Sequence, residues 1–241
     1  MSALLQVAHI SKSFSGLRAV EDVTFAVPEG AIVGLIGPNG AGKTTCFNVI
    51  AGVYRPDAGE VRLGGERIDG WRPDQICRAG VGRTFQLVKP FAGLSVMENV
   101  IVGALNACAS VREARQRSAE VIEQLGLAGK RDQMAASLTL PERKRLEVAR
   151  ALATRPRILL LDEAMAGLRP TEMDQMVALF RELNAKLGLT ILLIEHVMRA
   201  VMALSRHIVV LHHGEVIAAG TPEAVTRDPA VLECYLGEEA L

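Results

Sequence analysis

Apolar positions in the first third of the chain recur as short strand-like runs. The runs cover residues 5–10, 20–27 and 31–36, and the last of them leads into a glycine-rich turn. A helical pattern follows over about residues 43–50, and a further strand-like patch covers residues 60–63. Short β-type runs bounded by Gly and Pro predict strands, and the pattern after the turn predicts a helix.

The rest of the chain changes to a helical period and then alternates between strand and helix. Helical spacing dominates from about 95 to 153. The alternating part then contains a strand at 158–161, a helix at 171–187 that ends at Gly188, a strand at 189–194, a helix from about His196, strands at 208–211 and 216–219, and a last helix after Pro229. This order predicts an α/β domain with a helical insertion in its middle.

Composition narrows the class of protein. The 241 residues are 49% hydrophobic, so a sizeable core can form, and 27 basic residues balance 27 acidic ones. Neutral charge and nine aromatic residues argue against nucleic-acid binding, which favours basic surfaces and stacking rings. No apolar run approaches the ~18–20 residues of a membrane span, no signal peptide is evident, and the four cysteines are scattered. We expect a cytoplasmic protein with reduced thiols.

A glycine-rich segment after the third predicted strand fits the phosphate-loop pattern GxxxxGK[ST]. Its residues are Gly37, Pro38, Asn39, Gly40, Ala41, Gly42, Lys43 and Thr44. A chain of this composition would show roughly 0.004 such matches by chance, and the strand before and the helix after are the context that the motif requires. Backbone N–H groups would cradle an anion, Lys43 would contact the β- and γ-phosphates, and the Thr44 hydroxyl would ligate Mg²⁺. The sequence predicts binding of a nucleoside triphosphate.

A pair of carboxylates ends a second apolar strand. Asp162 and Glu163 follow the run 158–161 directly. With a phosphate loop in the same chain, the aspartate is the expected second contact of Mg²⁺, held largely through water. Glu163 can then act on the attacking water as general base or polarising group, which favours hydrolysis over phosphoryl transfer to a metabolite.

With their neighbours, these residues resemble the ATPase subunit of an ABC transporter over essentially the whole chain. The resemblance implies one domain over residues 1–241, with a phosphate-loop NTPase core (about 1–87 and 156–241), an N-terminal antiparallel β subdomain and a helical subdomain (about 88–155). It further implies that Phe14 stacks on adenine, although a core role is the alternative, and that Thr45 belongs to the nucleotide site. Gln86 matches the glutamine that senses Mg²⁺ and the attacking water, and His196 matches the histidine that contacts the γ-phosphate.

The segment in the place of the family signature departs from the family pattern. Thr139 replaces Ser, Leu140 and Pro141 replace two glycines, and Glu142 replaces Gln. Proline has no N–H to donate, and Glu142 would bring negative charge near the ATP of the opposite subunit. Thr139 and Glu142 also fit a helix capping box. Either the variant is tolerated, or a heterodimer has two unequal sites of which this chain's own phosphate loop is the better hydrolytic one.

The segments 81–86, 94–100, 195–202 and 220–237 resemble importers of the branched-chain amino acid class, in particular the larger of two paired ATPase subunits. The resemblance implies a second ATPase subunit in a hetero- or homodimer, membrane permease subunits, an indirect periplasmic binding protein, and a peripheral position on the cytoplasmic face of the bacterial inner membrane. The stretch 87–94 would help form the groove for the permease, or be an ordinary apolar loop. Cargo stays open, and a soluble ABC-type ATPase or a phosphate-loop metabolite kinase are the alternatives.

Cys46 lies in the first turn of the helix after the phosphate loop. The helix dipole could lower the pKa of its thiol, but we expect a buried, inert packing residue.

Overall fold

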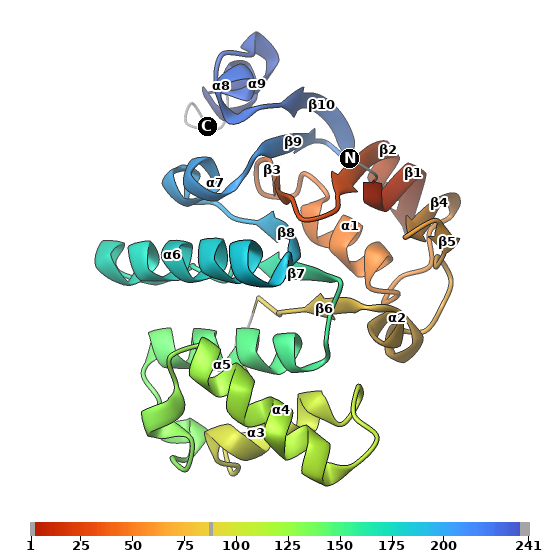
Figure 1. The fold of residues 1–241 in the computed structure, drawn as a ribbon. Coiled ribbons are helices and arrows are strands. Elements are labelled where there is room, and N and C mark those ends of the chain that lie inside the picture. Colours follow the sequence, from red (N-terminus) through yellow and green to blue (C-terminus); the bar gives the residue numbers. More distant parts are fainter. Residues whose placement is uncertain (1–2, 87–88, 237–241) are drawn as a thin grey trace.

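A computed structural model of the chain describes residues 3–86 and 89–236 (Figure 1). Its strands are β1 (Ala3–Phe14), β2 (Leu17–Pro28), β3 (Ile32–Ile36), β4 (Ala58–Leu63), β5 (Glu66–Arg67), β6 (Val81–Arg83), β7 (Ile158–Asp162), β8 (Thr190–Ile194), β9 (His207–His212) and β10 (Glu215–Gly220). Its helices are α1 (Lys43–Ile50), α2 (Pro73–Ala79), α3 (Val96–Ala104), α4 (Val111–Gln124), α5 (Leu140–Ala153), α6 (Pro170–Leu187), α7 (Met198–Leu204), α8 (Pro222–Val225) and α9 (Pro229–Leu236). Two short 3₁₀ turns cover Ala128–Lys130 and Ala135–Ser137. The predicted α/β fold class is confirmed.

The central sheet has the order β10-β9-β3-β8-β7-β6. The strands from β9 to β6 pair in parallel, and β10 is antiparallel to β9. Every residue of β3, β7 and β8 is buried, as expected for parallel strands that are covered on both faces. Because these strands are parallel, their carboxyl ends meet at one edge of the sheet.

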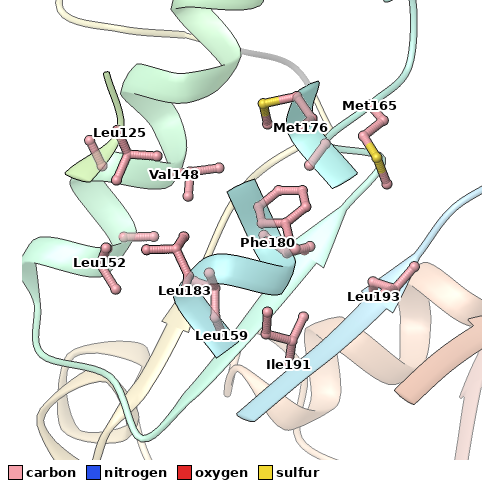
Figure 2. Packing of buried hydrophobic residues seen from close by; sticks show 14 of the residues in the cluster. Leu125, Val148, Leu152, Leu159, Met165, Met176, Phe180, Leu183, Ile191 and Leu193 are labelled. Carbon is pink, nitrogen blue, oxygen red and sulfur yellow. The ribbon is translucent and has the colours of Figure 1, made fainter. Parts of the chain in front are cut away.

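Alternate residues of the central strands enter two different cores. Leu159 and Ile191 join the core formed with α5 and α6, whereas Leu160 packs with the side chains of α1. Figure 2 shows Phe180 and Leu183 of α6 directed at the strands. Burial of an aromatic side chain such as Phe180 contributes about 1.5–3 kcal/mol. The helix predicted over residues 171–187 is confirmed, and Phe180 and Leu183 on it are buried, whereas Leu187 at its end is exposed.

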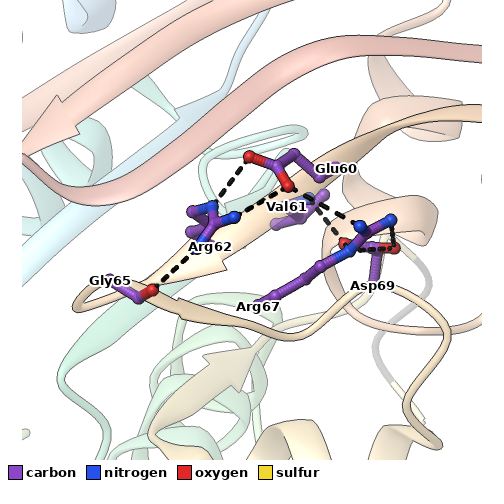
Figure 3. Close-up of polar contacts among 6 residues, drawn as sticks. All are labelled: Glu60, Val61, Arg62, Gly65, Arg67 and Asp69. Atoms are coloured by element: carbon purple, nitrogen blue, oxygen red, sulfur yellow. Dashed lines mark hydrogen bonds and ion pairs between the residues drawn. The ribbon is translucent and has the colours of Figure 1, made fainter.

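The N-terminal strands form a separate antiparallel sheet with the order β2-β1-β4-β5. A polar network ties β4 to the segment that contains β5 (Figure 3). Arg62 donates to both carboxylate oxygens of Glu60, Arg67 does the same to Asp69, and Asp69 also accepts the N–H of Val61 at 3.0 Å. The contact between Asp69 and Val61 joins the two segments and helps to hold the short edge strand β5, which is too small to be stable by itself.

Helices α3, α4 and α5 form the end of the molecule opposite α8 and α9 (Figure 1). Ser95 and Glu98 form a capping box at the start of α3, and Ser110 caps α4. In the described part of the chain, no helix is both long and apolar enough to span a membrane. The sequence pattern missed α2 and β6, which are too short to show a period, and α7 begins at Met198 instead of His196.

Candidate active site

The residues that the sequence predicts for phosphate binding, metal binding and catalysis lie along the carboxyl edge of the parallel strands. The phosphate loop follows β3, His196 follows β8, Asp162 ends β7 and is followed by Glu163, and Gln86 follows β6. Since β3, β8, β7 and β6 are neighbours in that order, segments far apart in sequence converge there. Open parallel sheets bind ligands at this edge.

Two glycines of the phosphate loop have conformations that only glycine fits. Gly37 has a φ of 146°, and a Cβ there would lie 2.0 Å from the carbonyl oxygen of Leu211. Gly42, the residue before α1, has a φ of 102°, and its Cβ would lie 2.4 Å from the carbonyl oxygen of Ala19. The glycines therefore allow the loop to pass close to other backbone before the helix begins.

Lys43 is buried beneath this loop. Its ammonium donates hydrogen bonds at 2.6 Å to the carbonyls of Gly37 and Pro38. Around it, Asn39, Gly40 and Thr44 are exposed, Ala41 is buried and Thr45 is half-buried. The positive charge is thus held inside the curl of the loop, at the start of α1, where an anion is favoured.

Glu163, Gln86 and His196 meet at one oxygen atom. The side-chain amide of Gln86 donates to Oε1 of Glu163 at 3.0 Å, and Nε2 of His196 lies 2.9 Å from the same oxygen. Glu163 itself has a φ of 50°, a left-handed conformation that is uncommon for a residue with a side chain. The structure therefore brings together the three residues that the sequence named for catalysis.

Asp162 is almost completely buried, and only one of its two carboxylate oxygens has a hydrogen-bond partner among the described residues. Its Oδ2 accepts a hydrogen bond from Arg83 at 3.1 Å, whereas its Oδ1 has no hydrogen-bond partner among the described residues. Burial raises the pKa of this carboxyl, and the Arg83 guanidinium opposes the shift. Thr44, Gln86 and Asp162 line one cleft of about 460 Å³. A hydroxyl, an amide and a carboxylate with a vacant lone pair are the oxygen ligands that suit a hard divalent cation.

No group of three His, Cys, Asp or Glu side chains suited to a metal occurs within residues 3–86 and 89–236. A cation in the cleft would accordingly rely on ligands besides carboxylates, such as phosphate oxygens and water.

Phe14 stands at the end of β1 with 38% of its surface exposed. Its ring packs edge-on against Tyr54, with the ring centroids 5.0 Å apart, and the ammonium of Lys12 lies 5.6 Å from its centroid. Tyr54 thus supports the Phe14 ring while part of the ring stays exposed, so the ring is available to a ligand.

The altered signature segment caps α5 as predicted. Thr139 is the N-cap, and its N–H donates to the carboxylate of Glu142 at 2.9 Å in a capping box. Lys130, which the sequence pattern did not single out, lies 2.7 Å from Glu142 and is the main cause of the lowered pKa of that carboxyl. In the described structure, no hydrogen bond joins Thr139 or Glu142 to the Glu163 cluster.

Further charged residues of the site are buried and escaped the sequence reasoning. The N–H of Met165 donates to Glu195 at 2.8 Å, and burial raises the pKa of Glu195 to about 7. The N–H of Phe85 donates to Glu147 at 2.6 Å, and burial raises the pKa of Glu147 as well. The ammonium of Lys144 donates to the carbonyl of Glu163 at 2.8 Å. In the sequence, these residues can be noticed only as charged residues within or beside apolar segments, as Glu195 is after β8.

Cys46 is fully buried in α1, and burial raises the pKa of its thiol to about 12. The expected burial is confirmed, and the raised pKa supports an inert packing role, because desolvation outweighs the helix dipole here.

Comparison with known proteins gives matches along the chain. The family model described as ABC transporter matches residues 20–166, and one described as branched-chain amino acid ATP-binding cassette transporter matches residues 215–240. The high-affinity branched-chain amino acid transport ATP-binding protein BraF of Pseudomonas aeruginosa is 42% identical over 250 residues, covering 98% of each chain. The lipopolysaccharide export system ATP-binding protein LptB of Acidithiobacillus ferridurans is 37% identical and covers 99% of each.

A solved structure of the ADP conformation of MJ1267, an ATP-binding cassette of an ABC transporter, has the same fold. Its TM-score is 0.90 at 31% sequence identity, and the match covers 98% of this chain and 100% of that one.

Proposed function

The chain belongs to the ABC transporter family as an ATP-binding subunit that hydrolyses ATP, and from this premise we propose that it powers the import of branched-chain or related small amino acids. BraF, which is similar over the full length, is named for branched-chain amino acid transport. LptB is named for lipopolysaccharide export, so overall similarity alone does not select the cargo. The match of residues 215–240 to the branched-chain amino acid model favours amino acids.

We propose that the carboxyl edge of the central sheet is the site of hydrolysis. The phosphate loop from Gly37 to Thr45 would hold the phosphates, with Lys43 against the β- and γ-groups and Phe14 stacked on the adenine. Mg²⁺ would be held by Thr44, Asp162 and Gln86, partly through water, and when bound it would neutralise charge that develops on the phosphates. The Oδ1 of Asp162, which has no hydrogen-bond partner among the described residues, supports this assignment.

The observation that carries the catalytic proposal is the contact of Gln86 and His196 with one oxygen of Glu163. Glu163 would accept a proton from the water that attacks the γ-phosphate. Gln86 would orient that water, and His196 would contact the γ-phosphate. All three side chains are polar, partly exposed and located beside the phosphate loop, as this chemistry requires.

Two kinds of partner complete the proposed assembly. A second ATPase subunit would place its ATP at the start of α5, against Thr139 and Glu142. The permease would dock in an apolar cleft of about 260 Å³ lined by Val53, Phe85 and Val102. All three side chains are exposed, with Phe85 at 59%. Phe85 directly precedes Gln86 in the sequence. Of the expected groove segment, residues 87 and 88 lie outside the described structure, and Phe91 is exposed.

We propose that the chain is one ATPase domain, with a helical subdomain over about residues 88–155, on the cytoplasmic face of the inner membrane. A periplasmic binding protein would deliver cargo to the permease from the other side. The exposed apolar surface beside Gln86 supports a membrane-protein partner, since large apolar patches mark interaction sites.

Reconstitution tests this function. The chain, its permeases and the second ATPase subunit are placed in proteoliposomes, and uptake of labelled leucine is measured with the binding protein outside and ATP inside. We expect ATP-dependent uptake that Lys43→Ala abolishes, while Lys186→Met, an exposed change on α6, leaves it intact. ATP hydrolysis without uptake of leucine, isoleucine or valine would contradict the cargo, and hydrolysis by a chain that binds no permease would favour a non-transport ATPase.

A further inference from the structure

Lys144 is a buried cation that the proposed catalytic roles do not use. It lies in the second turn of α5 with 4% of its surface exposed. Its ammonium donates to the main-chain carbonyl of Glu163 at 2.8 Å. Burying an ammonium is costly unless it gains hydrogen bonds and nearby opposite charge, and the carboxyls of Glu195 and Glu147 lie close enough to interact with it. A buried lysine that contacts the backbone of the proposed general base suggests a functional role for Lys144.

The backbone of Glu163 is fixed on both sides. Its N–H donates to the carbonyl of Ile194 at 2.9 Å, and its own carbonyl accepts from Lys144 and from the N–H of Ala166 at 3.2 Å. Its φ of 50° costs free energy and persists only where surrounding contacts hold it. From this backbone position the Glu163 carboxylate contacts Gln86 and His196.

We propose that Lys144 is a positioning residue for Glu163: through its hydrogen bond to the main-chain carbonyl, it holds the left-handed turn from which the carboxylate reaches the attacking water. The inference rests on the proposed role of Glu163 as general base. Helix α5 would then have two roles. Its N-cap, Thr139, would face the opposite subunit, and Lys144, one turn later, would position the general base Glu163 of its own site. A movement of α5 on subunit closure would thus be transmitted to Glu163.

The test is a double-mutant cycle on the reconstituted transporter. Lys144→Met keeps the length of the side chain but removes the donor, and we expect it to lower kcat about 10- to 100-fold with the KM for ATP within about twofold, since a small misplacement of a catalytic group has effects of this size. Lys144→Arg retains a donor and should recover most of the loss. In a Glu163→Gln background, Lys144→Met should cause no further loss in single-turnover phosphate release, because residues that act as a unit are not additive. Lys186→Met is the matched control.

Unpaired charge on Glu195 could perturb the fold of the Lys144→Met variant. The same substitution is therefore also made in Glu195→Gln, which keeps an acceptor for Met165, and it should lower kcat by the same factor relative to Glu195→Gln alone. An unchanged kcat in Lys144→Met, equal losses in the Met and Arg variants, or an equal loss in the Glu163→Gln background would each overturn the inference while leaving the function intact. Wild-type turnover in Glu163→Gln would instead remove the general base, and the inference with it.

Discussion

The ammonium of Lys130 lies 2.7 Å from the carboxylate of Glu142, in the first turn of the helix that would face the ATP of a second subunit. Glu142 taken alone would repel a polyphosphate. The ion pair offsets that charge and, together with the N–H of Thr139, keeps the carboxylate turned to its own helix. The altered signature would therefore repel the phosphates of a nucleotide less than the negative charge of Glu142 alone suggests.

Removing the Lys130 ammonium should leave the Glu142 carboxylate free to repel the phosphates of ATP. We expect Lys130→Met to raise the KM for ATP of the assembled transporter about two- to fivefold, because a partly exposed ion pair contributes up to about 1 kcal/mol. Lys130→Met combined with Glu142→Gln should return the KM to the wild-type value. Equal KM values for all three proteins would show that this pair does not face nucleotide.

Glu163→Gln should preserve ATP binding, slow hydrolysis by about 10²- to 10⁴-fold and hold the ATP-bound dimer closed, because the amide cannot accept the proton of the attacking water. If the two sites of a heterodimer are unequal, this change abolishes nearly all ATPase activity, whereas the matching change in the partner leaves a substantial remainder. Both variants are measured in the same reconstituted complex. Equal losses, or activity of this chain as a homodimer, would rule out the asymmetry.

Lys43→Ala should weaken ATP binding roughly 10- to 100-fold, in line with the about 1.5–3 kcal/mol of a hydrogen bond to a charged group. The side chain lies inside the phosphate loop, so its loss removes the charge that faces the phosphates. Titration calorimetry with ATP measures the effect, with Lys186→Ala as the control. An affinity equal to that of the control would remove Lys43 from the site.

Phe14→Ala should weaken ATP binding by roughly 1–3 kcal/mol, the range of aromatic–base stacking, with little change in thermal stability. The ring is 38% exposed and packs edge-on against Tyr54, so little core is lost. Competition with a fluorescent ATP analogue and a melting curve distinguish the two roles. A lower melting temperature with unchanged affinity would assign Phe14 to the core.

Cys46 should resist alkylation in the native protein. Its thiol pKa of about 12 lies above the usual range, so the reactive thiolate is almost absent at pH 8 and forms only as the pH nears that value. Iodoacetamide followed by peptide mass spectrometry should find Cys46 unmodified in the folded chain and modified in guanidinium. Modification at equal rates in both states would contradict the burial.

The phosphate loop and the strand that ends in Asp162 and Glu163 could be predicted because their chemistry depends on neighbours in sequence. The same holds for the Thr139 capping box, whose two residues are three positions apart. The convergence of Gln86 and His196 on Glu163 was expected only from the family resemblance. Arg83, Glu147 and Glu195 could be noticed only as charges within or beside apolar segments, and such a charge looks the same in sequence whether it faces water or a buried backbone group.

The sequence by itself determined the longer strands and helices and the nucleotide-binding motif, because hydrophobic period and glycine placement act within one or two turns of chain. Only the tertiary structure decided which charges meet. Lys130 and Glu142 are separated by a loop, and Lys144 reaches Glu163 from another element, so their distances depend on how α5 packs against the sheet. Electrostatic contacts depend on distance and burial in space, and neither quantity is written in the spacing of residues along the chain.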